Sequence, residues 1–254
     1  VKRMYAEEFM KIKNELIELV IEFEQTERKI NLLSNAYMLE FYEELQQQRY
    51  LLSENDYLIK AIAMKNDGKS KEEIKAFLED CRKQFSANMQ GFYTQYRMAQ
   101  ELGKKASNLS ENDMNNMDEA FIEYCSVHHP LIKAHSTPED RSFYSTLIML
   151  YRMGNVMGFK KFLKECKFKY SSHEITEEEY NNIAKLYLES IDNLKEISQK
   201  KKQEFPLNKE DIFYKEELLT RELMYLREKN YKAREMNKAL QADFKLHFSF
   251  EFTL

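Results

Sequence analysis

The chain has 254 residues, of which only 5 are Gly and 3 are Pro, so it holds few of the residues that end strands and form tight turns. Charged residues make up 32% of the chain, yet the formal net charge is only -4. Both signs are therefore interspersed, and no excess of positive charge is available to hold a polyanion. The composition favours long helices and argues against a nucleic-acid partner.

Two features predict a cytoplasmic protein without a membrane partner. No stretch approaches the roughly 18 consecutive apolar residues that would span a bilayer, and the first residues, VKRMYAEEF, lack the apolar core of a secretory signal. The cysteines Cys81, Cys125 and Cys166 are odd in number and lie far apart among apolar residues. This distribution indicates buried, reduced thiols rather than a disulfide framework.

Residues 1-106 are predicted to form a long helical hairpin. Between about Met4 and Asn66 there is no Pro or Gly, and apolar residues recur at alternating three- and four-residue steps, as in a coiled-coil seam. These residues are Phe9, Ile12, Leu16, Leu19, Phe23, Ile30 and Leu33. We expect this helix to end at the turn around Gly68, and a second helix, about Ser70 to Ala106, to fold back antiparallel on it.

Capping boxes mark the expected helix starts. In this motif a side-chain acceptor at the cap and a carboxylate three residues later satisfy backbone N–H groups that would otherwise lack partners. The pairs are Ser70 with Glu73, Ser110 with Asp113, Thr137 with Asp140, Thr176 with Glu179, and Asn208 with Asp211. Pro138, which follows Thr137, suits the first helical position because its missing N–H costs nothing there.

Residues 174-242 are predicted to form a second helical hairpin. One helix runs from about Thr176 to Gln203, a break follows at Phe205-Pro206-Leu207-Asn208, and a long helix continues to about Leu240. Its apolar residues keep a seam, so the two hairpins could pack on each other or on a second copy, giving a homo-oligomer.

The tail, residues 243-254, alternates with period two from Phe244 to Phe252 and is rich in aromatic residues, which is a strand pattern. A lone strand is not stable in water. We therefore expect an extended tail that adds to another copy, lies in a groove between helices, or frays.

Residues 110-167 are predicted to form a small central helical module. Between Asp118 and Lys164 an amphipathic helix ends at His129-Pro130, a short loop follows, Pro138 starts a second helix, and a Gly-Asn break precedes a short final helix. This order resembles the J-domain of DnaJ-type co-chaperones, in which a His-Pro-Asp tripeptide ends one helix. A subset of bacterial J-domain proteins also looks similar in its long N-terminal coiled coil and its Phe-Pro-x-Asn turn.

The module differs from that family at the residues through which the family acts on its chaperone partner. Leu131 stands where the resemblance implies an Asp that triggers ATP hydrolysis by a DnaK-class chaperone. The stretch Ile122 to Val127 holds no Lys or Arg, although the family presents cations there to an acidic partner surface. The resemblance thus implies a J-like fold without the ATPase-stimulating role.

Other chemistry has less support in the sequence. Cys125, His128, His129 and His135 are the only concentration of metal-capable side chains. Cys125, His129 and the loop residue His135 could approach one zinc ion, but neither a clear fourth ligand nor acceptors to orient these ligands are evident. Cys125 also lacks an orienting group and a Gly-rich turn that would supply an oxyanion hole. The run Lys200-Lys201-Lys202 suits a solvated helix terminus. We expect no catalytic, cofactor-binding or metal-binding residues, and no enzyme activity.

The sequence therefore predicts an all-α protein in which long antiparallel helical hairpins flank a J-like module. The favoured function is a non-enzymatic adaptor or chaperone-like protein that binds protein partners. The predicted partner-binding residues are His129, Pro130, Leu131 and Lys133. Two alternatives stay open: a structural subunit that oligomerises through its coiled-coil helices, and a genuine DnaJ-type co-chaperone.

Overall fold

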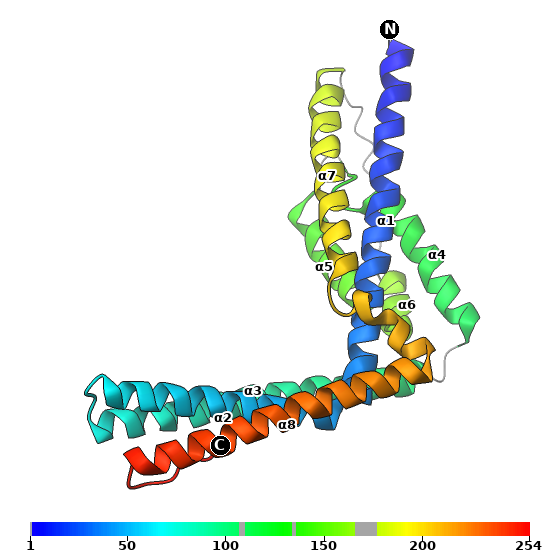
Figure 1. The fold of residues 1–254 in the computed structure, drawn as a ribbon. Coiled ribbons are helices and arrows are strands. Elements are labelled where there is room, and N and C mark those ends of the chain that lie inside the picture. The colour runs from blue at the N-terminus through cyan, green and yellow to red at the C-terminus, as the bar shows by residue number, and fades with distance from the viewer. Residues whose placement is uncertain (1, 107–109, 134–135, 166–176) are drawn as a thin grey trace. The chain divides into compact units, whose positions relative to one another are not determined.

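The structure, a computed structural model, describes residues 2–106, 110–133, 136–165 and 177–254. Within these residues the chain is all-α, with nine helices and no strand (Figure 1). The predicted fold class is thus confirmed at this level. The helices are α1 (Lys2–Glu40), α2 (Tyr42–Asn66), α3 (Lys71–Ala106), α4 (Glu111–His128), α5 (Pro138–Arg152), α6 (Val156–Glu165), α7 (Glu177–Gln203), the 3-10 helix η1 (Leu207–Tyr214) and α8 (Glu216–His247).

The chain divides into two compact units, and each unit combines segments from both halves of the sequence. The first comprises Val1–Ser34 and Leu102–Lys209, and the second comprises Asn35–Glu101 and Glu210–Leu254. The contiguous segments 1-106, 110-167, 174-242 and 243-254 expected from the sequence are grouped differently here. The reason is that helices near the N-terminus pair with helices near the C-terminus.

In the first unit, α7 lies along α1 and runs in the same direction (Figure 1). The ion pairs advance together along both helices: Glu15 with Lys195 at 2.7 Å, then Glu22 with Lys202 at 3.1 Å. This spacing of seven residues on each helix is that of a parallel coiled coil. Helices α4, α5 and α6 complete the unit, whose core includes Phe9, Leu16, Val20, Phe121, Leu147, Tyr151, Phe159, Tyr187 and Ile191.

The buried row of α1 differs from the predicted seam. Leu16 and Val20 are buried as apolar residues should be, but the next buried residues are Glu24 and Arg28. Phe23 and Ile30, which the apolar pattern placed in the seam, are only half-buried. A four-residue step carries the buried row from Leu16 to Arg28, so α1 turns a carboxylate and a guanidinium toward α4 and α5.

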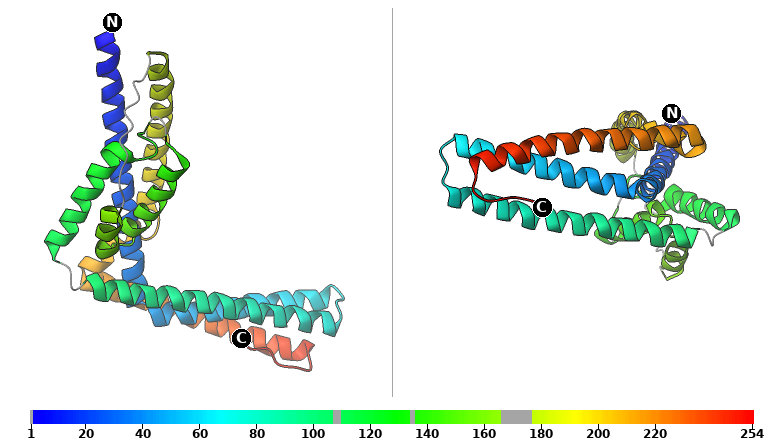
Figure 2. Two further views of the ribbon diagram at one scale, coloured as in Figure 1. Left: turned by 180° about the vertical axis from the view of Figure 1, so that it is seen from behind. Right: turned by 60° about the horizontal axis from the view of Figure 1, so that its bottom comes forward.

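The second unit contains the predicted α2–α3 hairpin, which is antiparallel (Figure 2). Tyr42 stacks on Phe92 with ring centroids 5.4 Å apart, whereas Tyr50, further along α2, meets Phe85, further back on α3. The helix α2 ends at Asn66, as predicted, and Gly68 follows with φ of 80°.

Helix α8 packs along α2 in the same direction, with buried amides linking the two helices. The Asn230 side chain donates to the Glu44 carbonyl oxygen at 2.9 Å, and the Asn237 side chain donates to Asn55 Oδ1 at 2.9 Å. The structure pairs α7 with α1 in the first unit and α8 with α2 in the second, whereas the sequence led us to expect residues 174-242 to form one hairpin. Similar apolar seams on all four helices left this pairing open in the sequence.

The single helix expected from Met4 to Asn66 is interrupted at Phe41, where φ is -113° and ψ is 21°. The backbone hydrogen bonds continue on both sides of the break, from the Phe41 N–H to the Tyr37 carbonyl and from the Leu45 N–H to the Phe41 carbonyl. The Phe41 ring is 1% exposed and packs with Tyr37, Ile212 and Leu226. Burial of this ring, rather than a Pro or Gly, accompanies the break.

Three of the predicted capping boxes are confirmed. Ser70, Ser110 and Thr137 each accept a hydrogen bond from the backbone N–H three residues later, and the carboxylate there accepts from the cap N–H. The box predicted at Thr176 lies outside the described residues.

The box predicted at Asn208 is wrong, because Asn208 lies within η1 and α8 begins only at Glu216. Helix α8 also continues to His247, beyond the predicted end near Leu240. The first part of the predicted extended tail is thus helical, and the rest forms no strand. Residues after His247 instead lie in a groove between helices, one of the arrangements expected for this segment, with Phe248 and Phe252 buried against α2 and α3.

Candidate functional site

The candidate site is the corner between α4 and α5, which contains all of the predicted partner-binding residues. Helix α4 ends at His128, and His129 is extended, with ψ of 133°, because a residue that precedes proline is disfavoured in helical geometry. The N–H groups of Ile132 and Lys133 both donate to the His129 carbonyl oxygen at 2.9 Å. In addition, the Tyr187 hydroxyl of α7 donates to the Ile132 carbonyl oxygen. The corner is therefore a turn held by backbone bonds.

The four predicted residues occupy different environments. His129 is buried, with 4% of its surface exposed, and Pro130 is half-buried. Leu131 is 44% exposed although it is apolar. Lys133 pairs with Asp140 of α5 at 2.8 Å. Leu131 is thus the predicted residue whose side chain is most available to a partner.

His129 holds the turn through both of its ring nitrogens. The Leu131 N–H donates to Nδ1 at 3.1 Å, so Nδ1 carries no proton and Nε2 bears the hydrogen of the neutral ring. Nε2 donates to the Tyr144 hydroxyl at 2.8 Å, and that hydroxyl donates to Glu24 Oε1 at 2.8 Å. The turn is thus connected, through one histidine and one tyrosine, to a carboxylate on α1.

Glu24 is 4% exposed and is neutralised by Arg152 at the end of α5, whose Nε lies 2.6 Å from Glu24 Oε2. A second ion pair lies one turn further along α1, where the buried Arg28 binds the partly exposed Asp118 of α4. The Tyr151 hydroxyl also donates to Asp118 Oδ1 at 2.9 Å. Each buried charge of α1 is therefore paired with a helix of the central module.

Burial shifts the pKa values of His129, Tyr144 and Cys125 in the direction that favours the uncharged form of each side chain. Desolvation, aided by the nearby positive charge of Arg152, lowers the pKa of His129 to about 4. Desolvation first, and the Glu24 carboxylate second, raise the pKa values of Tyr144 and Cys125. His129 is therefore neutral, and the Cys125 thiol protonated, near neutral pH. A protonated thiol without an activating base is a poor nucleophile.

The described residues of this corner do not form a metal site. Among the described residues, no group of three or more His, Cys, Asp or Glu side chains is placed to hold an ion. His135 lies outside those residues. Both ring nitrogens of His129 are already hydrogen-bonded, and Cys125 is fully buried as a free thiol. Cys81 is also free and buried, as predicted, whereas Cys166 is not among the described residues.

The run Lys200-Lys201-Lys202 is engaged in ion pairs. Lys200 pairs with Glu196 on its own helix at 2.6 Å. Lys201 and Lys202 reach across to α1, where they pair with Glu27 at 2.7 Å and Glu22 at 3.1 Å. These contacts help to join α7 to α1, which leaves the run poorly suited to binding phosphate.

Sequence reasoning missed the residues that hold the corner in place, because it considered the apolar seam alone. They are Glu24, Arg28, Asp118, Tyr144 and Arg152. One signal was available. Glu24 and Arg28 continue a four-residue spacing from Leu16 and Val20, so a helix with that buried face must bury both charges.

Comparisons with models of known protein families, with curated proteins and with solved structures found no match. In the part of the chain that the structure describes, no helix combines the length and apolar character needed to cross a membrane.

Replacing Tyr144 with Phe is expected to lower the free energy of unfolding by about 1–3 kcal/mol. The change removes one hydroxyl and leaves the His129 Nε2–H and Glu24 Oε1 without the partner they share. Urea denaturation followed by circular dichroism measures the effect. The control is Tyr93→Phe on α3, where the side chain is 50% exposed and the cost should stay within about 0.5 kcal/mol. Equal losses in the two variants would contradict the network.

Stability is expected to fall between about pH 6.5 and pH 4. Over this range a histidine in the unfolded chain takes up a proton, whereas folded His129 stays neutral until about pH 4. The unfolded state therefore binds more protons, and the free energy of unfolding decreases by up to about 3 kcal/mol as the pH drops. Urea denaturation across this pH range should show that the free energy of unfolding of His129→Gln depends less on pH than that of the unmodified protein.

The matched control for this measurement is His128→Gln. Burial also lowers the pKa of His128, but His128 is only half-buried, so its removal should leave most of the pH dependence in place. A pH dependence that persists in His129→Gln and disappears in His128→Gln would show that the wrong histidine has been identified.

Proposed function

We propose that this chain is a non-enzymatic adaptor or chaperone-like protein whose central module, α4 to α6, is a degenerate J-like module that presents its corner to a protein partner. The observation that carries the proposal is the contrast at the corner between a buried, fully hydrogen-bonded His129 and an exposed Leu131. A network that fixes a turn and leaves an apolar side chain outside is suited to contact with another protein.

The order of the helices supports the J-like reading. A helix ends at His-Pro, a turn follows, a helix started by Pro138 comes next, and the chain breaks at Gly154 before α6. Phe121 of α4 stacks on Tyr151 of α5 with ring centroids 3.8 Å apart, so the two helices pack through aromatic residues. These features support a J-like module.

The charges at the corner argue against stimulation of a DnaK-class ATPase. Leu131 replaces the Asp that the family requires, and Lys133, the nearby cation, already pairs with Asp140. The described face of α4 from Ile122 to Val127 offers no positive side chain to an acidic partner. We therefore propose a partner other than a DnaK-class chaperone, recognised through an apolar contact.

The alternative of an assembly subunit has less support, since the seams that suggested it are used within the chain. Residues of α1 pack on α7, and residues of α2 pack on α8. Light scattering separates the two functions: an adaptor should have the mass of one chain, 30.6 kDa, whereas an assembly subunit should form a stable oligomer on its own.

Leu131→Asp is expected to reduce partner recovery at least tenfold in quantitative affinity purification from the source cells, because it places a charge in an apolar contact. The control is Leu52→Asp on α2, which changes an equally apolar side chain of similar exposure, 55%, in the other unit of the chain. Recovery should be unchanged in this control. Equal recovery with all three proteins would remove the corner as the binding site.

The purified protein is expected to leave ATP turnover by its cognate DnaK-class chaperone unchanged, because the acidic trigger is absent. If the module keeps the J-like geometry, Leu131→Asp should introduce measurable stimulation, whereas Leu131→Asn, which has a similar size and no charge, should not. Stimulation by the unmodified protein would favour the co-chaperone alternative. No stimulation by Leu131→Asp would count against the J-like module.

A further inference from the structure

The C-terminal tail, residues 248–254, is held in the second unit through its backbone. The side chain of Gln241 donates to the Phe252 carbonyl oxygen at 2.7 Å, and Arg82 Nε donates to the Thr253 carbonyl oxygen at 2.9 Å. The Tyr50 hydroxyl donates to the Leu254 carbonyl oxygen at 3.4 Å. Three helices, α8, α3 and α2, thus supply donors to three successive carbonyl groups. Such donors recognise an extended backbone rather than one particular sequence.

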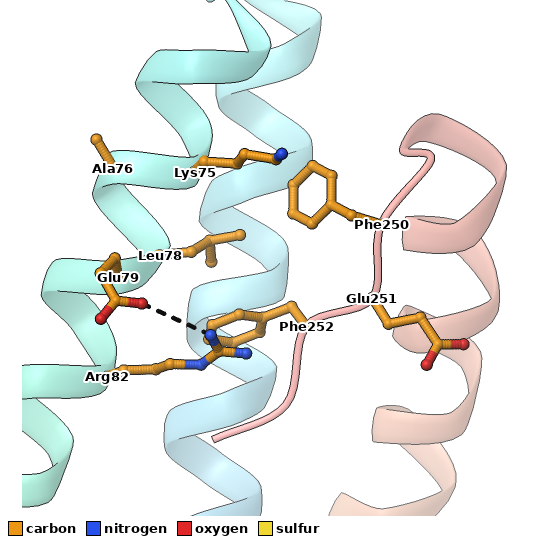
Figure 3. A pocket seen from close by; sticks show the side chains of 8 residues that line it. All are labelled: Lys75, Ala76, Leu78, Glu79, Arg82, Phe250, Glu251 and Phe252. Atoms are coloured by element: carbon orange, nitrogen blue, oxygen red, sulfur yellow. Dashed lines mark ion pairs between the residues drawn. The ribbon is translucent and has the colours of Figure 1, made fainter.

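Side chains of the tail fill the groove at alternate positions. Phe248 and Phe252 are 8% and 1% exposed, and they join a cluster formed by Leu58, Ala61, Ile74, Leu78 and Phe244. Phe250 lies nearer the surface, with Lys75 Nζ 5.1 Å from its ring centroid (Figure 3). The guanidinium of Arg82 lies 4.9 Å from the Phe252 ring centroid. The groove therefore selects aromatic residues by burial and by cations at its edge.

The groove is not completely filled by the tail. A hollow of about 370 Å³ lies beside Phe250 and Phe252, and its other lining residues include Lys75, Glu79 and Arg82 of α3 (Figure 3). Glu251 points away from α3 and pairs with Lys245 of α8 at 2.9 Å. The tail therefore leaves open space between its aromatic side chains and α3.

The tail itself has little structure of its own. Phe248 N–H donates to the Phe244 carbonyl, but no backbone–backbone hydrogen bond joins residues 249–254 to another described residue. The segment is therefore bound in the manner of a peptide ligand, through side-chain donors and aromatic anchors. Its backbone makes no hydrogen bonds to the backbone of the described helices.

We propose that the groove formed by α2, α3 and α8 binds extended peptide segments with aromatic residues at alternate positions, and that residues 249–254 occupy it as a ligand supplied in cis. The use of the groove for client segments rests on the proposed chaperone-like function. The tail then limits binding, because a client must displace it.

The test uses the protein without residues 249–254 and a fluorescent peptide with the sequence of residues 247–254. Fluorescence anisotropy should show saturable binding, at least tenfold tighter than to the full-length protein, whose groove is occupied. A peptide carrying Phe250→Ala and Phe252→Ala should bind at least tenfold more weakly. In the truncated protein, Arg82→Ala should weaken binding about tenfold, whereas Lys83→Ala, at a neighbouring exposed position, should not change it.

Circular dichroism shows whether truncation preserves the helices. If truncation unfolds the protein, full-length Phe252→Ala provides the second test, because it loosens the tail and should bind the peptide more tightly than the unmodified protein. Unfolding of both variants would identify the tail as part of the core and overturn the proposal. Absence of saturable binding, or equal binding of the two peptides, would also overturn it. The proposal would also be overturned if the full-length protein formed a stable dimer in which the two chains exchange their tails.

This experiment is independent of the corner between α4 and α5. Leu131→Asp should leave peptide binding unchanged, because the groove and the corner belong to different units of the chain. The experiments can therefore show partner binding at the corner without peptide binding in the groove. They can equally show peptide binding without partner binding.

Discussion

The first unit depends on one constraint, the burial of Glu24 and Arg28 on α1. Removing a charge from water costs several kcal/mol unless a partner and hydrogen bonds replace the lost hydration. Arg152 and Tyr144 bind the Glu24 carboxylate, and Asp118 pairs with the Arg28 guanidinium. A shift of α1 by one helical turn would bury both charges without these partners. The pairs therefore fix the register between α1 and the helices α4 and α5 more than they add stability.

In the same network, the residues that fix the turn are different from the residue that is exposed to a partner. His129, which the sequence suggested as a contact residue, faces inward and fixes the turn through the Leu131 N–H. Leu131 faces outward. In this arrangement a substitution at the surface can alter recognition without disturbing the turn, whereas a substitution at His129 or Tyr144 should disturb both. The stability measurements and the binding measurements therefore report on different residues.

Local signals in the sequence predicted the helices well and their pairing poorly. The end of α2 at Asn66, the end of α7 at Gln203 and the caps at Ser110 and Thr137 depend on neighbouring residues, so they could be predicted. Pairing depends on which of several similar apolar seams meet, and no local pattern distinguishes them. The break at Phe41 could not be predicted either, because it reflects burial of a ring against residues far along the chain.

The sequence suggested where the candidate site lies, but not which contacts hold it in place. The sequence placed the corner at His129 to Lys133 and expected its side chains to face a partner. It could not show that His129 is hydrogen-bonded through both nitrogens, because Tyr144 and Glu24 reach it from other helices. Nor could it foresee that Lys133 is paired with Asp140, which is seven residues away across the turn.

The parallel pairing of α1 with α7 and of α2 with α8 affects how the chain can fold. Hydrogen-bonded partners in these pairs lie about 180 residues apart, as in Glu15 with Lys195 and Glu44 with Arg227. Contacts of such long sequence separation form slowly, since a large loop must close before they contribute. During synthesis, the apolar rows of α1 and α2 emerge from the ribosome long before the helices that cover them, so both are exposed to aggregation until translation has passed α7 and α8.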